Sequence, residues 1–574
     1  MSSIGLRTNR AIYLAVLPAD EPSPLLPESD EEEAQDEDEG EGNEEDEEDE
    51  EEEEQEELTV RIDFEGIGQR IIALDVPVRP YETVAAGKKG ILFYSERVPH
   101  EDGVVLHRYS LEDREASAVM ENVRNYAVSA DGEKLLVETP DRWGIVEATG
   151  EDVDLAEGAI ATGDMRMKVD LRREWQQMFR EAWRYQRDYF YVDNVHGLDL
   201  DWAYRKYAPW VEHVRHRGDL TYILDILGGE TAIGHSFTCC GDWPDIDRVP
   251  VGLLGADVEI EGGHYRIARI YTGENWNPDL RAPLSGPGID AREGDYILAV
   301  DGVSLDASMN FYSLFDRTAD KQTAITLNDR AGTEGAREVT VVPVASEVGL
   351  RMRHWVEDNR RRVDELSKGR LAYVWLPNTA REGQTSFNRY YFAQQHKKGA
   401  IIDERFNHGG LIADYVVDLL SRELMGFFSN PLGERQPWTA PNAAIWGPKV
   451  MIINEASGSG GDMLPYMFRL KEIGPLVGTR TWGGLVGIWD VPPLVDGGRI
   501  TAPRGGFYDL DGEWAVENEG VPPDIEVEQT PRLVHQGHDP QLEKAVEVAL
   551  ELLKEQAVEV LPQPPDPVRV RRPE

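Results

Sequence analysis

The sequence predicts a multidomain protein of mixed α/β and β structure, and three observations lead to this fold class. Short segments with period-two alternation come before residue 163, and a helical hydrophobic period takes over in 164–248. The β pattern returns from Val251. After Glu347, short apolar strands alternate with helical stretches, which is typical of a parallel sheet covered by helices. The length of 574 residues suits about three to five domains.

The charge balance excludes two classes of partner. Lys plus Arg number 59 against 108 Asp plus Glu, which gives a net charge of −49. The stretch 28–57 holds 23 of these acids and no Lys or Arg, so the rest of the chain still carries −26. Nucleic acids and anionic membranes recruit basic surfaces, so neither is expected as a partner. We expect the acidic stretch to be unfolded, as a solvated spacer rather than a binding tail.

Other features of composition indicate a cytoplasmic protein. No run of 18 apolar residues occurs, and Arg7 and Arg10 interrupt the N-terminal apolar stretch, so we expect neither a membrane span nor a signal peptide. Cys239 and Cys240 are adjacent, and a bridge between them would be strained. The histidines show no spacing with Cys or carboxylates that suits a metal ion, so no metal and no other cofactor is predicted.

The first 163 residues are interpreted as strands interrupted by the acidic insert. We expect a buried strand in Ala11–Leu17, within residues 1–27, and alternation resuming at Leu58–Phe64 after the insert at 28–57. Short strands through 58–163 have the spacing of propeller blades, but they are too few to close a ring. Either another polypeptide completes the ring, or the chain is the C-terminal piece of a longer protein.

The remaining residues divide into four further segments. In 164–248, Trp175, Met178, Phe179 and Ala182 share one helical face, and Leu220–Leu227 continues in helix. A β-rich domain is expected at 249–346, and an α/β domain at 347–561. The apolar strands predicted in the α/β domain are 371–375, 400–403, 450–454 and 475–478. The tail at 562–574 is rich in proline.

The strongest chemical signal is Asn454-Glu-Ala-Ser-Gly-Ser-Gly-Gly-Asp462, which lies between a predicted strand and a helix. A serine among glycines at such a turn exposes its hydroxyl close to backbone N–H groups and a helix N-terminus. Ser459 is therefore the candidate nucleophile. The alternative is a Gly-rich turn with a serine N-cap. Ser457 is expected to be structural and Asp462 to cap the helix.

A second glycine loop, Asp403-Glu-Arg-Phe-Asn-His-Gly-Gly410, also follows a strand. Backbone N–H groups at Gly409 or Gly410 could bind an oxyanion, because glycine allows the backbone to approach a tetrahedral intermediate closely. A plain turn explains the pattern equally well. His408 in this loop is expected to be solvated rather than to act as a base.

Together these motifs resemble the tail-specific, or C-terminal-processing, serine peptidases. Arg480-Thr-Trp-Gly-Gly-Leu-Val-Gly487 and Val516-Glu-Asn-Glu-Gly-Val-Pro-Pro-Asp524 extend the resemblance. The order of propeller strands, a helical segment ending in Gly234-His-Ser236, a PDZ-like domain and an α/β domain is similar to the second half of tricorn-like proteases. The resemblance covers the chain except the acidic insert, and it implies a crotonase/ClpP-like fold for the α/β peptidase domain.

The resemblance also implies roles for particular residues. It places the nucleophile on Ser459, the general base on His235 and the supporting carboxylate on Glu517. The oxyanion donors would be the N–H groups of Gly460 and of the Gly409 loop. The family has a serine directly before the histidine, whereas this chain has Gly234, which implies a looser or water-mediated orientation of His235. From the residues alone, His235 is a core or capping histidine.

The resemblance further implies how peptide substrates bind. The strand containing Gly484, Leu485 and Gly487 resembles the one that adds to a substrate backbone, although an ordinary loop is the alternative. The PDZ-like domain has Gly252-Leu-Leu-Gly255 where such domains hold a carboxylate; it would bind peptide C-termini or only position its neighbours. Tricorn-like enzymes prefer basic P1 side chains through an acidic residue, and the stretch 426–431 offers none.

The sequence therefore predicts a tricorn-like serine peptidase that acts through an acyl-enzyme on Ser459 and forms a homo-oligomer, a hexamer by the resemblance. The alternative is an inactive peptide-binding scaffold or a fragment of a longer tricorn-like protein. The presence of Ser459, His235 and Glu517 favours catalysis. A chymotrypsin-like protease with a PDZ domain does not fit, because its catalytic domain is a β-barrel rather than α/β.

Overall fold

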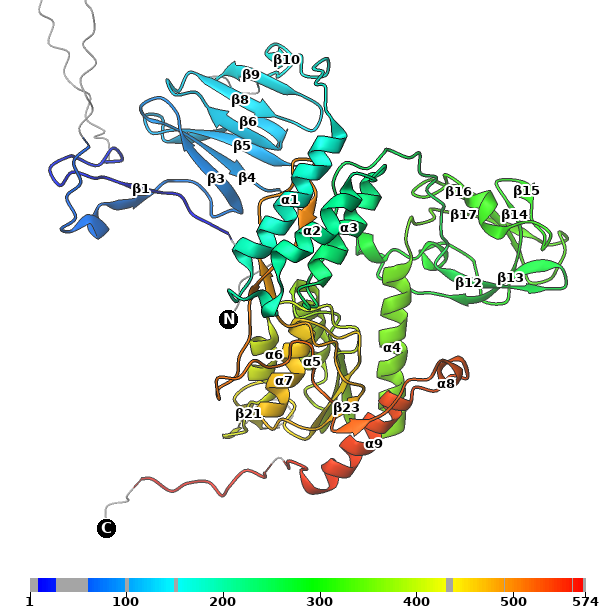
Figure 1. Cartoon of the computed structure of the whole chain (residues 1–574). Helices are drawn as coiled ribbons and strands as arrows, with labels where there is room; N and C mark the ends of the chain where they lie inside the picture. The colour runs from blue at the N-terminus through cyan, green and yellow to red at the C-terminus, as the bar shows by residue number, and fades with distance from the viewer. Residues whose placement is uncertain are drawn as a thin grey trace, which may run out of the picture. The chain divides into compact units, whose positions relative to one another are not determined.

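The computed structural model describes residues 9–26, 60–98, 103–148, 153–429, 437–489, 491–559 and 561–570. The acidic stretch 28–57 lies outside the described residues. The chain forms two compact units, residues 6–168 and residues 169–574, and Figure 1 labels many of the elements of both.

Residues 6–168 form antiparallel sheets. A two-stranded sheet pairs β1 (Tyr13–Ala15) with β2 (Ile71–Ala73). The first four-stranded sheet contains β3 (Tyr81–Ala86), β4 (Ile91–Glu96), β5 (Val104–Ser110) and β6 (Glu115–Val123). The second contains β7 (Asn125–Val128), β8 (Lys134–Glu138), β9 (Trp143–Glu147) and β10 (Ala159–Ile160). Phe93 and Leu106 of the first sheet and Leu135 and Val137 of the second belong to one buried cluster.

Two expectations in this unit are corrected by the structure. The predicted buried strand at Ala11–Leu17 is shorter, and its first residue, Tyr13, is exposed. The described part of the alternating segment, Val60 to Phe64, is not a strand, and its apolar side chains are exposed. A period-two pattern needs a sheet to bury its apolar face, and these residues pair with no other strand among those described.

Three helices follow, and the predicted helical period is confirmed. They are α1 (Leu171–Tyr189), α2 (Leu200–Val211) and α3 (Arg217–Gly229). The Asp170 and Asp199 side chains cap α1 and α2 by accepting backbone N–H groups. The expected face of α1, Trp175 to Ala182, is buried against Leu220 and Leu224 of α3. The short strand β11 (Thr238–Cys239) comes after these helices.

The PDZ-like segment is an antiparallel sheet in the order β12-β13-β14-β16-β17, with β15 on β14. Its strands are β12 (Ala256–Glu261), β13 (His264–Ile270), β14 (Tyr296–Val300), β15 (Val303–Ser304), β16 (Thr323–Asn328) and β17 (Arg337–Val341). Ile267, Ile297, Ile325 and Leu327 are completely buried at its centre. Helix α4 (Val348–Ser367) leaves this sheet directly for the next domain.

The last domain contains a parallel five-stranded sheet in the order β18-β19-β22-β23-β27. Its strands are β18 (Leu371–Trp375), β19 (Gly399–Asp403), β22 (Lys449–Ile453), β23 (Leu476–Gly478) and β27 (Ile525–Glu526). The predicted parallel α/β pattern is therefore confirmed. Smaller antiparallel pairs are β20 (Gly426–Phe428) with β21 (Trp438–Ala440), β24 (Gly487–Trp489) with β26 (Ala502–Gly505), and β25 (Arg499–Ile500) with β11.

Helices cover both faces of this sheet. Alternate strand residues pack against α5 (Arg381–Ala393), α6 (Ala413–Leu420) and α7 (Gly460–Leu470) on one face. The other face packs against α4 and α9 (Pro540–Glu555), and Figure 1 shows α4 and α9 close together, with α8 (Pro531–His535) before α9. The carboxyl ends of β19 and β22 lead into the two glycine loops, which places both at the same edge of the sheet.

Candidate active site

Ser459 lies at the sharp turn between β22 and α7. Its φ of 59° and ψ of −115° are unfavourable for a residue with a Cβ. The Ser459 N–H donates to Asp462 Oδ2 (2.8 Å) and to the Gly484 carbonyl oxygen (3.1 Å). The side chain is half-buried, whereas Ser457 is fully buried and donates to the Glu404 carbonyl oxygen. The strained turn thus presents the Ser459 hydroxyl at the carboxyl edge of the sheet.

The two glycine loops pack backbone against backbone beside Ser459. A Cβ on residue 409 would lie 2.6 Å from Ser459 Cβ, and one on residue 460 would lie 2.0 Å from Thr379 Oγ1. The Gly409 N–H, an expected oxyanion donor, already donates to Asn407 Oδ1 (2.9 Å). Within the described residues the N–H groups of Gly460 and Gly410 have no partner. These two groups are the open donors at the turn.

Asp462 holds the Ser459 turn and the neighbouring 481–484 segment through hydrogen bonds. Its buried carboxylate accepts the Ser459, Gly483 and Gly484 N–H groups and the Thr481 hydroxyl. The predicted helix cap is confirmed as a capping box, in which Ser459 is the N-cap residue of α7 and Asp462 accepts its N–H. The same carboxylate also holds the 481–484 segment. Burial raises the pKa of Asp462, although these hydrogen bonds act in the opposite direction.

His235 lies on the loop between α3 and β11. Its carbonyl oxygen accepts the Thr501 hydroxyl (2.7 Å), which also accepts the Phe237 N–H (2.8 Å). The residue is 7% exposed, and its Nδ1 has no hydrogen-bond partner among the described residues. Burial lowers the pKa of His235, while the negative charge of Glu517, a backbone interaction with Val486 and Asp462 oppose the shift. The imidazole is therefore kept neutral at neutral pH, as a general base requires.

Glu517 joins the histidine loop to the segment after Trp482. Its Oε1 accepts the Gly234 N–H (2.9 Å), and its Oε2 accepts the N–H groups of Leu485 and Val486 (both 2.7 Å). The neighbouring Asn518 side chain donates to the Ala232 carbonyl oxygen. The carboxylate thus acts on His235 through its charge and through the backbone of Gly234, without a direct hydrogen bond to the ring.

The structure brings the loops of the sequence-predicted residues together. Gly484 Cα would lie 3.1 Å from a Cβ on residue 234, and the Gly484 carbonyl accepts the Ser459 N–H. The predicted substrate strand is partly occupied, because the N–H groups of Gly484 and Leu485 bind Asp462 and Glu517. Gly487 begins β24, which pairs with β26 on one side. His408 is exposed, as expected, and part of the stretch 426–431 lies outside the described residues.

Trp482 is the neighbour of His235 that the sequence did not single out. Its ring centroid is 5.3 Å from that of His235, with an interplanar angle of 77°. It also stacks on Phe237. No local pattern could reveal this contact, since the residues are far apart in the sequence; only the quoted Arg480–Gly487 motif marked the segment.

Most N–H groups of the carboxylate-binding loop expected in the PDZ-like segment donate within the chain. The Gly252 and Leu253 N–H groups donate to backbone carbonyls, and the Gly255 N–H donates to Glu347 Oε2 (3.0 Å). Arg351 holds the other oxygen of Glu347 and also contacts Asp257. A carboxylate of the same chain thus accepts one N–H group of the loop in which the sequence predicted a carboxylate-binding site.

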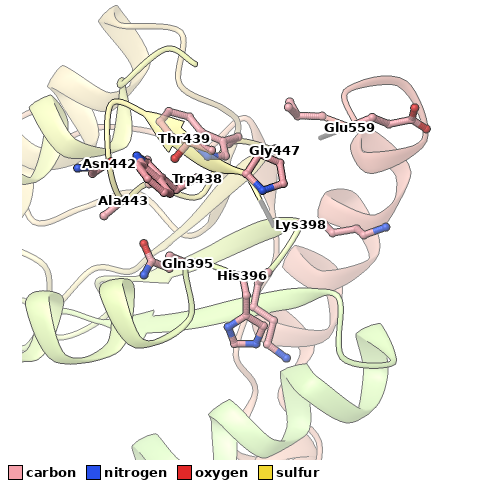
Figure 2. Close-up of a pocket in the computed structure, with 14 residues that line it drawn as sticks. Gln395, His396, Lys398, Trp438, Thr439, Asn442, Ala443, Gly447 and Glu559 are labelled. Atoms are coloured by element: carbon pink, nitrogen blue, oxygen red, sulfur yellow. The ribbon is translucent and has the colours of Figure 1, made fainter. Parts of the chain in front are cut away.

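A cavity of about 840 Å³ lies at the other edge of the sheet and is a poor candidate for this chemistry. Its lining includes Lys398, just before β19, and Gly447, just before β22, so it faces the amino ends of the strands. Figure 2 shows His396, Lys398, Trp438 and Glu559 around it.

In the part of the chain that the structure describes, no three or more His, Cys, Asp or Glu side chains gather in an arrangement that would bind a metal ion. None of the helices found there combines the length and apolar character that crossing a bilayer requires.

Comparison with known proteins confirms the resemblance. Residues 171–229 match the tricorn protease C1 domain, residues 252–346 the tricorn protease PDZ domain, and residues 370–527 peptidase family S41. The crystal structure of the tricorn protease superposes with a TM-score of 0.77 at 28% identity, over 85% of this chain and 48% of that one.

Two curated relatives show the extent of the match. Tricorn protease homolog 1 of Streptomyces coelicolor is 36% identical over 88% of this chain and 49% of its own length. Tricorn protease of Thermoplasma acidophilum is 30% identical over 88% of this chain and 47% of its own length. The chain thus spans about half the length of these relatives.

Proposed function

Since the chain carries tricorn-type C1 and PDZ domains and a family S41 peptidase domain, we propose that it is a serine peptidase that hydrolyses peptides through an acyl-enzyme. The observation that carries the proposal is the strained Ser459 turn, which lies beside two open N–H donors and the loop of a buried, neutral His235. A scaffold that only binds peptides would need neither the strain nor the lowered histidine pKa.

The proposed chemistry uses groups already described. The Ser459 hydroxyl attacks the peptide carbonyl carbon while His235 takes its proton, and the oxyanion accepts hydrogen bonds from Gly460 N–H and the 409–410 loop. The C–N bond then breaks, and His235 returns the proton to the leaving amine. Water then attacks the acyl-enzyme carbonyl carbon while His235 takes its proton. The ester bond to Ser459 breaks, His235 returns the proton to the Ser459 oxygen, and the acid product is released. Glu517 stabilises the imidazolium by its negative charge.

Substrate binding and assembly are part of the proposal. A peptide would add to β24 from Gly487 onward, since the N–H groups of Gly484 and Leu485 are used within the chain. The two four-stranded sheets of residues 6–168 would be blades of an incomplete propeller, and the chain would assemble as a homo-oligomer of the tricorn type. Light scattering on the full chain tests the assembly: a monomer at working concentration contradicts it.

The central test is reaction with a fluorophosphonate probe. The full chain, the Ser459→Ala variant and the control Ser421→Ala are treated with the probe, and the adduct is located by mass spectrometry. We expect labelling of Ser459 in the unmodified chain and in the control, and none in Ser459→Ala. Absence of labelling in a folded sample that also leaves casein peptides intact would refute the peptidase and favour the scaffold.

A further inference from the structure

The indole of Trp482 lies between the loop that carries His235 and the turn that carries Ser459. It makes the edge-to-face contact with the His235 imidazole described above. Its backbone N–H donates to the Ser457 carbonyl oxygen (2.9 Å), and the residues on either side of it are bound to the Asp462 carboxylate. The residue is 38% exposed. Trp482 therefore has a fixed backbone and a ring in contact with the candidate base.

Three glycines make room for this ring. A Cβ on residue 484 would lie 2.3 Å from Trp482 Cζ3, and one on residue 458 would lie 2.5 Å from Cε3. On the opposite side, a Cβ on residue 234 would lie 3.0 Å from Cζ2 and 3.1 Å from Cη2. The six-membered ring thus fills the space beside Gly234 where a side chain would begin.

Few hydrogen bonds orient the imidazole of His235. Its buried Nδ1 has no hydrogen-bond partner among the described residues. No hydroxyl is available at Gly234, and Glu517 Oε1 accepts the Gly234 N–H instead. Thr501 fixes only the backbone carbonyl of His235. Besides the backbone interaction with Val486, side-chain packing is what remains to select the rotamer of the imidazole, and the two aromatic rings packed against it are Trp482 and Phe237.

The geometry points to Trp482 as a positioning residue for His235. Its benzo ring takes the orienting role that a hydroxyl at position 234 would otherwise have. The inference rests on the proposed peptidase function and adds a residue to it. It also makes positions 234 and 482 dependent on each other, because a side chain at 234 and the indole compete for the same space.

The first test replaces Trp482 by Leu, with Phe as a conservative variant that keeps an aromatic ring. We expect kcat to fall about 10- to 100-fold in Trp482→Leu and less in Trp482→Phe, because a displaced base slows proton transfer. KM should stay within about threefold, since substrate binding is not removed. The acid limb of kcat should move to higher pH, because water reaches His235 while Glu517 and Asp462, the carboxylates that raise its pKa, remain.

The second test uses the dependence between the two positions. Gly234→Ser alone should lower activity, because its Cβ would press on the indole. In the Trp482→Leu background the same change should cost clearly less activity, since the contact with the indole is gone and only the contact with Gly484 Cα (3.1 Å) remains. Such a dependence is not expected if Trp482 only supports the fold.

The readouts separate this inference from the proposed function. Trp202→Leu, a similarly exposed tryptophan on α2, is the control and should leave kcat and probe labelling unchanged. If the unmodified chain is labelled at Ser459 while Trp482→Leu and Trp482→Phe keep its kcat and acid limb, the positioning role is refuted and the peptidase stands. An equal loss of activity from Gly234→Ser in both backgrounds also refutes it. If the unmodified chain is not labelled, the proposed function itself fails.

Discussion

Replacing Glu517 by Gln tests how the carboxylate links the histidine loop to the catalytic machinery. An amide has one acceptor oxygen, so it can keep the bonds from Leu485 and Val486 only by turning its NH₂ towards the Gly234 N–H. The hydrogen bond from the Gly234 N–H to a charged group is then lost, which costs about 1.5–3 kcal/mol of interaction free energy. The hydrogen bonds from Leu485 and Val486 now end on a neutral oxygen, which weakens each by roughly 0.5 kcal/mol. The expected total is about 2.5–4 kcal/mol.

This loss should appear in catalysis, because the bond to Gly234 fixes the backbone next to His235 and the negative charge stabilises the imidazolium. If all of it is expressed in the transition state, kcat/KM falls about 70- to 900-fold. Peptide hydrolysis measured across pH tests this, with Glu519→Gln, an exposed neighbour, as the control. Urea unfolding measures separately how much of the loss affects stability.

The pH dependence has a definite sign. Burial lowers the pKa of His235, so activity should persist below the ordinary histidine value of about 6.5 and decline at more acidic pH. Glu517 opposes this shift, so Glu517→Gln should lower the pKa of His235 further and move the acid limb to lower pH. An activity within about threefold of the unmodified chain, together with an unchanged acid limb, would show that this account of Glu517 is wrong.

Three further predictions concern other parts of the chain. Gly409→Ala should reduce probe labelling at least tenfold, because its Cβ would collide with Ser459; Gly497→Ala, also at positive φ but with open space around it, is the control. Burial lowers the pKa of Lys449 from 10.5 to about 8, so Lys449→Met should raise the free energy of unfolding at pH 7 by about 2–3 kcal/mol. This gain should shrink as the pH rises from 8 to 10, and an equal gain at pH 7 and 10.5 in urea unfolding would contradict the prediction. Glu347→Ala should free the Gly255 N–H and let a peptide with a free C-terminus, but not its amide, bind in fluorescence anisotropy; tight binding by the unmodified chain would contradict a loop whose N–H groups donate within the chain.

The sequence predicted the parallel sheet well because both faces of that sheet are buried. Runs such as Leu371–Trp375 are apolar at every position, and every residue of this strand is buried in the structure. The strand predicted from the alternating pattern at 58–64 was wrong, because an alternating segment forms a strand only where a partner strand is present. Local pattern alone cannot supply that partner.

The candidate site was predictable to a different degree for each residue. Ser459 was visible from glycine spacing at a strand-to-helix junction, since a backbone constraint leaves a local signature. His235 and Glu517 came only from family resemblance, because their loops are far apart in the sequence. The loops meet through the hydrogen bond between Gly234 and Glu517, which are 283 positions apart. The contact of Trp482 with His235 was not predicted, because side-chain packing between domains leaves no periodic pattern in the sequence.

The loop that carries the base and the turn that carries the nucleophile are held by a common set of contacts. Asp462 binds both the Ser459 N–H and the segment on either side of Trp482, and Glu517 binds both Gly234 and the continuation of that segment. A displacement of the 481–486 segment would therefore move the serine turn and the histidine loop together. Such a shared support keeps the relative geometry of two groups from different domains more constant than separate anchors would, since one movement changes both positions in the same direction.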